Sequence, residues 1–163
     1  MKIALTTDHT GFEQLKQLKV FLEAAGHTCR DFGPTELNTE DDYPELIKPA
    51  ALAVARGDCD MGIIMGGSGE GEAMAANRIK GVRCTVFYGP ARALSPVDAE
   101  GREPQDDMEI IRLSRQHNNA NMLSLAARFL SLEDMQKAVT LWLATPFEGI
   151  ERHARRSQQL DLL

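Results

Sequence analysis

The side chains most able to do chemistry are gathered in residues 66–77, where an apolar run breaks into alternating glycines and restarts as a helix-prone segment. Without Cβ atoms, backbone N–H groups can point at an anion or a developing oxyanion near Gly67, Gly69 and Gly71. Ser68 and Glu72 add a hydroxyl group and a potential base at the same place. The glycine spacing alone is equally compatible with a tight structural turn. It fits neither a Walker loop, which needs a following Lys-Ser/Thr pair, nor a dinucleotide-binding loop.

Further polar side chains adjoin other predicted strands. Asp8 and His9 follow the first strand, Arg128 follows the fifth, and His117 with Asn118 precedes the fifth. Ligands of open parallel sheets bind beyond the carboxyl ends of the strands, so we expect these side chains to gather there with the glycine loop. Each also has a structural explanation, namely a helix cap, a surface histidine or an ion pair. Their gathering at one edge would favour a binding site.

A pair of arginines lies near the end of the chain. Arg152 and Arg156 are four residues apart and therefore share one face of a predicted helix. Two planar guanidinium groups directed to one point suit a phosphate better than a carboxylate. The alternative is a solvated basic end, but an otherwise acidic chain concentrates arginine here.

Short apolar strands alternate with amphipathic helices, which predicts one α/β domain, residues 1–163, around a five-stranded parallel sheet. The predicted strands are 2–6, 28–32, 61–65, 82–88 and 122–126. The predicted helices are 12–25, 44–55, one that follows a capping box at Ser131 and ends near 144, and a last one from 150 onward. A polar stretch at about 91–112 is predicted to be an insertion, either a lid or a decoration.

Composition excludes several classes of function. The formal net charge of −6 argues against nonspecific binding of nucleic acid. Three cysteines without ligand spacing predict neither disulfides nor a zinc site. No stretch resembles a signal peptide or a membrane span, so we expect a cytoplasmic protein that does not bind membranes. A metal constellation of His9, His117, Asp8 and Glu72 is disfavoured because the glycine loop already offers electrophilic stabilisation; no cofactor is expected.

Seven motifs occur in order along nearly the whole chain. They are Lys2-Ile3-Ala4 with Asp8-His9-x-Gly11-Phe12, Asp31-Phe32-Gly33, Asp42-Tyr43-Pro44, Gly66-Gly67-Ser68-Gly69-x-Gly71-Glu72, Ala75-Ala76-Asn77, Ser114-Arg115-Gln116-His117-Asn118-x-x-Asn121 and Arg152-His153-x-x-Arg156. Together they resemble the ribose-5-phosphate isomerase B family, which also contains galactose-6-phosphate and allose-6-phosphate isomerases. The resemblance implies a Rossmann-like α/β/α sandwich. It also implies a homodimer or homotetramer with shared sites, to which the C-terminal helix crosses, and metal-free isomerisation of a sugar phosphate.

The resemblance also implies roles for individual residues. One subgroup of the family uses a cysteine base at the position of Gly66, whereas the other has glycine there and a glutamate base, matched here by Glu72. The remaining implied roles are enediolate stabilisation by Ser68 and the loop N–H groups, ring opening by His117 with Asp8, sugar contacts by Asn118 and Tyr43, and phosphate binding by His9, Arg128, Arg152 and Arg156. The chain departs from the family pattern at Ala126-Ala127 and in the long insertion.

The sequence therefore predicts an aldose–ketose isomerase that moves a proton between C2 and C1 of an open-chain sugar through an enediolate. Such a reaction needs a base, donors for the oxyanion and an anchor for the remote phosphate. Ribose 5-phosphate is the expected substrate. The alternatives are another aldose phosphate with four or six carbons, or a sugar-phosphate sensor without catalysis, which would not need Glu72.

Overall fold

A computed structural model describes all 163 residues of the chain. Its centre is a five-stranded sheet in which every neighbouring pair of strands is parallel, in the order β2-β1-β3-β5-β4. The strands are β1 (Lys2–Thr7), β2 (Thr28–Asp31), β3 (Met61–Gly66), β4 (Cys84–Phe87) and β5 (Met122–Ala126). The predicted five-stranded parallel sheet is thus confirmed, with boundaries that differ by at most a few residues.

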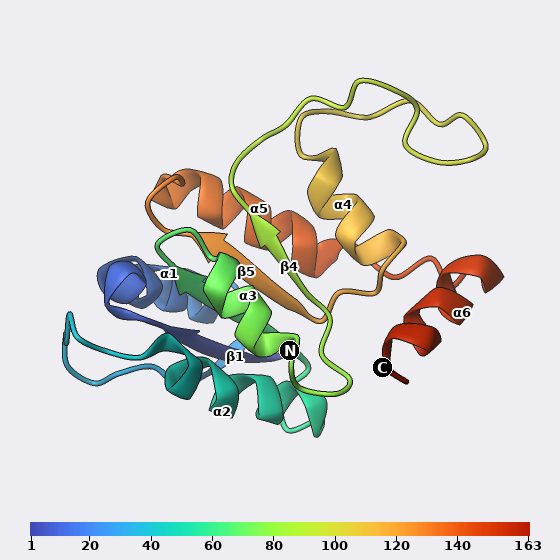
Figure 1. Cartoon of the computed structure of the whole chain (residues 1–163). Coiled ribbons are helices and arrows are strands. Elements are labelled where there is room, and N and C mark those ends of the chain that lie inside the picture. The colour runs from blue at the N-terminus through green and yellow to red at the C-terminus, as the bar shows by residue number, and fades with distance from the viewer.

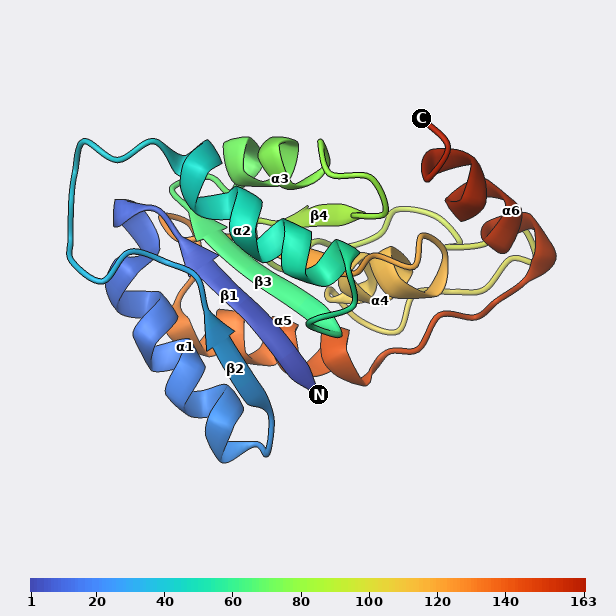
Figure 2. The same cartoon turned by 90° about the horizontal axis from the view of Figure 1, so that it is seen from below.

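Helices cover both faces of this sheet (Figures 1 and 2). They are α1 (Phe12–Ala24), α2 (Tyr43–Ala55), α3 (Glu70–Ala76), α4 (Glu109–Gln116), α5 (Leu132–Ala144) and α6 (Glu151–Leu160), with a short 3₁₀ turn at His9–Gly11. Successive strand residues point to opposite faces. Ile3 and Leu5 accordingly pack in one core with α1, α4 and α5, while Ala4 packs in a second core with α2 and α3. The three-layer α/β/α sandwich is therefore confirmed.

The helix α6 stands apart from the layers (Figure 1). An extended segment connects it to α5, and the buried Arg115 fixes the start of that segment by donating from Nε to the carbonyl of Thr145, 3.2 Å away. The far end of α6 is held by Arg83, whose guanidinium lies 2.7 Å from Asp161. These contacts place α6 beside the amino ends of the strands.

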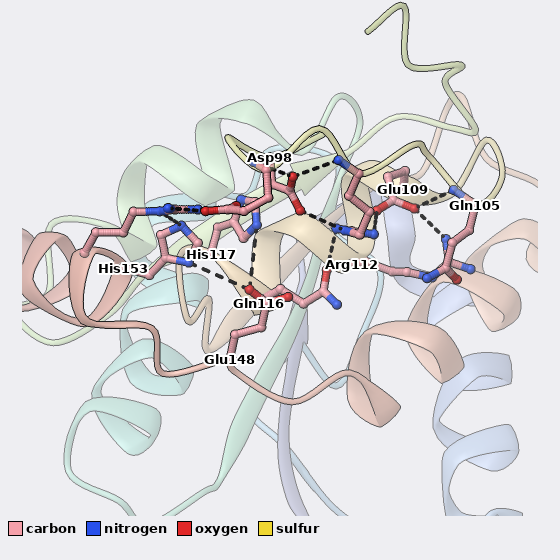
Figure 3. Close-up of polar contacts among 11 residues, drawn as sticks. Asp98, Gln105, Glu109, Arg112, Gln116, His117, Glu148 and His153 are labelled. Atoms are coloured by element: carbon pink, nitrogen blue, oxygen red, sulfur yellow. Dashed lines mark hydrogen bonds and ion pairs between the residues drawn. The ribbon is translucent and has the colours of Figure 1, made fainter. Parts of the chain in front are cut away.

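The insertion between β4 and α4 is ordered by polar contacts (Figure 3). The carboxylate of Glu109, 1% exposed, accepts from Arg102 at 2.8 Å and from Arg112 at 3.3 Å. Helix α4, which the sequence did not predict, begins at Glu109, within the stretch of 91–112 predicted to be an insertion. No helix is both long and apolar enough to span a membrane.

Candidate active site

The glycine loop connects β3 to α3, as the sequence predicts, and it is held down on β5. Gly69 has a φ of +76°, a conformation that favours glycine, and a Cβ there would lie 2.9 Å from Ser124 Oγ. Ser124 Oγ instead donates to the carbonyl of Gly69 at 2.7 Å. The N–H groups of Gly67, Ser68 and Gly69 donate to no other group of the chain. They are therefore free to stabilise an anion.

Glu72 lies in the first turn of α3 and is 4% exposed. Its carboxylate occupies the space beside Gly66, where a Cβ atom would overlap it. Burial raises the pKa of Glu72 above its usual value, and the charges of Asp8 and Asp41 raise it further. A carboxylate with a raised pKa is a stronger base than one in water, and this one stands next to the free N–H groups.

An acidic pair holds His9 beside this loop. His9 Nδ1 lies 2.7 Å from Asp41 Oδ1, and this hydrogen bond is the main reason that the pKa of His9 is raised. Asp8 Oδ1 accepts from the backbone N–H of Thr10 at 2.8 Å, so Asp8 does act as a helix cap. Asp41 was not predicted, because its contact with His9 spans 32 residues and the sequence spacing carries no signal for it.

Two more predicted residues border the loop. A Cβ atom at Gly71 would lie 2.8 Å from the ring of Tyr43, and one at Gly67 would lie 3.2 Å from Arg128 Nε. Glycine at these positions lets an aromatic ring and a guanidinium group approach the loop backbone. The predicted residues at this edge are Asp8, His9, Tyr43, Gly67, Ser68, Gly69, Gly71, Glu72 and Arg128.

The expectation that His117 and Asn118 share this edge is wrong within one chain. Both residues precede β5, and the residues before a strand lie at its amino end, whereas Asp8 follows β1 at the carboxyl end of the parallel sheet. A strand of five residues is about 16 Å long. Figures 1 and 2 show that α6, with Arg152 and Arg156, also lies on the amino side of the sheet.

A second polar group lies at this amino edge and contains His117, Glu148, Arg152 and His153 (Figure 3). The rings of His117 and His153 have centroids 4.2 Å apart, and Glu148 lies 3.9 Å from a nitrogen of each. Arg152 Nε donates to His153 Nε2 at 3.2 Å. Burial lowers the pKa of His153, and the charges of His117 and Arg152 lower it further. His153 and Glu148 were not among the predicted site residues, although His153 belongs to the motif Arg152-His153-x-x-Arg156.

Two clusters have donor atoms within 4.8 Å of one another, as a metal ion would require: Asp8 with His9 and Asp41, and His117 with Glu148 and His153. In the first cluster, Asp41 and the backbone of Thr10 already engage these atoms. In the second, His153 Nε2 accepts from Arg152, so the ring proton of a neutral His153 lies on Nδ1. One atom in each cluster, Asp41 Oδ2 and His153 Nδ1, is buried without a hydrogen-bond partner.

Chemically, the two groups are complementary. The carboxyl edge of the sheet offers a buried base, free N–H donors and a single arginine. The amino edge offers two histidines and two arginines, of which Arg156 has no acidic partner within 4.0 Å. The buried carboxylate next to free N–H donors is found only in the first group, and the pair of arginines is found only in the second.

Comparisons with known proteins agree on one family. The model of the family described as "Ribose/Galactose Isomerase" matches residues 3–98 and 105–160. Among curated proteins, the chain is similar to ribose-5-phosphate isomerase B of Escherichia coli, with 34% identity over 99% of this chain and 95% of that protein. It is also similar to ribose-5-phosphate isomerase B of Mycolicibacterium paratuberculosis, with 31% identity over 100% and 89%.

Solved structures give the same result. Ribose-5-phosphate isomerase B of Clostridium thermocellum superposes with a TM-score of 0.84 and 33% identity, over 99% of this chain and 96% of that one. The Mycoplasma genitalium enzyme, solved with bound ribulose 5-phosphate, superposes with a TM-score of 0.83 and 31% identity, over 99% and 94%.

Proposed function

The chain belongs to the ribose/galactose isomerase family and is an aldose–ketose isomerase, and we propose that it interconverts ribose 5-phosphate and ribulose 5-phosphate with Glu72 as the base. The observation that supports this proposal most directly is the position of the Glu72 carboxylate. It is buried against Gly66, beside a loop with free N–H groups. The named relatives are ribose-5-phosphate isomerases B, and one of them was solved with bound ribulose 5-phosphate.

In the proposed reaction, Glu72 removes the proton from C2 of the open-chain aldose and returns it to C1, while the hydroxyl proton on O2 moves to O1. Negative charge develops on the carbonyl oxygen of the substrate during the first transfer. The N–H groups of Gly67, Ser68 and Gly69 face no competing acceptor, so they stabilise that oxygen without first breaking a bond in the protein. The Ser68 hydroxyl is exposed and adds a further donor.

We further propose that each complete site combines the carboxyl edge of one chain with the amino edge of a second copy. In that arrangement His117 and Asn118 of one chain would contact the sugar, and Arg152 and Arg156 of the same chain would contact the phosphate. Glu72, Tyr43 and Arg128 of the other chain would contact the same substrate molecule. The separation of the two polar groups within one chain supports this arrangement. In it, His117 assists ring opening with Asp8 of the other chain.

The experiment is an assay of ribulose 5-phosphate formation by the wild-type protein and two matched variants. Removal of a general base costs about 10²–10⁴-fold in rate, so Glu72→Gln should lower kcat by that range with little change in KM. Glu70→Gln, an exposed carboxylate in the same turn, is the control and should leave kcat unchanged. Equal losses in both variants would contradict the assignment of Glu72. Binding of ribose 5-phosphate by the wild type without turnover would contradict catalysis and favour a sensor.

A further inference from the structure

Residues 99–104 lie outside the match to the family model, yet they form a defined structure. Asp98 Oδ1 accepts from the backbone N–H groups of Glu100 and Arg102, at 3.0 and 2.9 Å. Arg102 then reaches the body of the protein, where it donates to the buried Glu109 at 2.8 Å and to Gln116 at 3.3 Å. The turn that carries Glu100 is therefore held by Asp98 through its backbone and by Arg102 through contacts with α4 (Figure 3).

This turn places Glu100 on Arg152 of α6. Glu100 accepts two hydrogen bonds from the guanidinium group, 2.8 Å from Nη1 and 2.9 Å from Nη2. The hydrogen bonds from Arg152 lower the pKa of Glu100 below its usual value, as expected for a carboxylate that is stabilised by a guanidinium group. Arg152 thus has its charge balanced by a parallel, two-point contact, the same geometry with which arginine holds a phosphate.

The other arginine of the same helix face is in a different state. Arg156 is exposed and has no acidic partner within 4.0 Å. Of the two arginines proposed to hold the substrate phosphate, one is free and the other is occupied by a carboxylate from the inserted segment. A phosphate that approaches this face must displace Glu100 to use Arg152 fully.

We propose that Glu100 is an internal competitor for the phosphate clamp, which holds Arg152 in the empty enzyme and weakens the binding of the substrate phosphate. This inference rests on the proposed function of Arg152 and Arg156. The side chain of Glu100 is 63% exposed, and exposed ion pairs are weak, so a phosphate dianion can displace it. The insertion therefore raises the KM for the substrate without contacting Glu72.

The test compares Glu100→Gln with Glu103→Gln, which removes the same charge from an exposed side chain of the same segment that has no ion-pair partner. Three quantities are measured at low ionic strength: KM and kcat for ribose 5-phosphate, and the Kd of inorganic phosphate by calorimetry. Glu100→Gln should lower both KM and Kd about two- to fivefold, as expected for loss of an exposed ion pair. Glu103→Gln should resemble the wild type.

A double-mutant cycle shows whether the effect passes through Arg152. In an Arg152→Ala background, Glu100→Gln should no longer lower the Kd of phosphate. An increase in Kd or KM on Glu100→Gln would mean that Glu100 orients Arg152, and would overturn the proposal. Equal effects of Glu100→Gln and Glu103→Gln would mean that the change in Kd comes from the net charge of the protein, and would also overturn the proposal. The Kd of phosphate needs no turnover, so it decides the inference even where no isomerisation is detected, an outcome that would contradict only the proposed function.

Discussion

The carboxylate of Glu72 fills the space in which a side chain at Gly66 would begin. These two residues are six positions apart, one at the end of β3 and the other in the first turn of α3. The cysteine at 66 and the glutamate at 72, which the resemblance implies as the bases of two subgroups, are therefore sterically exclusive at this point. A glutamate at 72 in this conformation requires glycine at 66.

This relationship predicts strong coupling between the two positions. Gly66→Ala should displace the carboxylate, lower kcat as severely as Glu72→Gln, and destabilise the fold by about 1–3 kcal/mol through overpacking. In the double variant with Glu72→Ala the overlap is absent, so the free energy of unfolding should recover relative to Gly66→Ala alone. Chemical denaturation of the single and double variants measures this coupling, and strictly additive losses would contradict the packing described here.

The raised pKa of Glu72 predicts how activity depends on pH. The base must be ionised to accept a proton, so kcat/KM should fall as the pH is lowered through the pKa of Glu72 in the free enzyme. Because burial raises that pKa, the acid limb should lie above the ordinary glutamate value of about 4.3. A pH–rate profile measures it, and a limb at or below the ordinary value would contradict the assignment of the base.

The same raised pKa predicts a cost in stability. Between the unfolded and folded pKa values the folded chain binds more protons at Glu72, so stability is lost as the pH rises through this window. Glu72→Gln should therefore be more stable than the wild type at neutral pH, and the difference should shrink as the pH falls toward 4. Melting curves across this range provide the measurement, with Glu70→Gln as a control that should show no such gain.

The proposal that two chains share a site predicts complementation. Glu72→Gln and the double variant Arg152→Ala/Arg156→Ala should each be nearly inactive alone. After subunit exchange, mixed dimers should regain activity, because one of their two sites combines an intact carboxyl edge with an intact amino edge. Mixtures shown by mass spectrometry to contain mixed dimers, yet still inactive, would place each site within one chain.

The cysteines are predicted to be bystanders. Cys59 and Cys84 are buried, and burial raises the pKa of both thiols; burial also raises the pKa of the partly exposed Cys29 to about 11. Thiols in this state are poorly nucleophilic. Treatment of the folded protein with iodoacetamide should leave isomerisation largely unchanged, whereas inactivation prevented by substrate would indicate a thiol in the mechanism.

The alternation of apolar strands and amphipathic helices was enough to predict the sheet, and β5 has the predicted bounds. Helix α4 was missed because it follows an acidic, proline-containing stretch. In addition, its first residue, Glu109, is charged but buried, whereas the hydropathy pattern predicts a charged residue to be exposed. Local spacing predicted the glycine loop with Glu72. It could not show Asp41 beside His9, because that contact depends on how distant segments pack. The place of His117 at the amino edge, in contrast, follows from its position before β5 in a parallel sheet, which the expectation of one shared edge overlooked.

The anchoring of the insertion through Glu109 has a consequence for how this chain can change. Glu109 is 1% exposed, and Arg102 and Arg112 supply its compensating charge. Removing one partner of a buried ion pair is usually far more damaging than replacing all partners together. Loss of residues 99–104 would remove Arg102 and leave Arg112, at 3.3 Å, to balance the buried charge of Glu109, so a shortened loop would carry a cost in stability that a change at Glu109 could relieve.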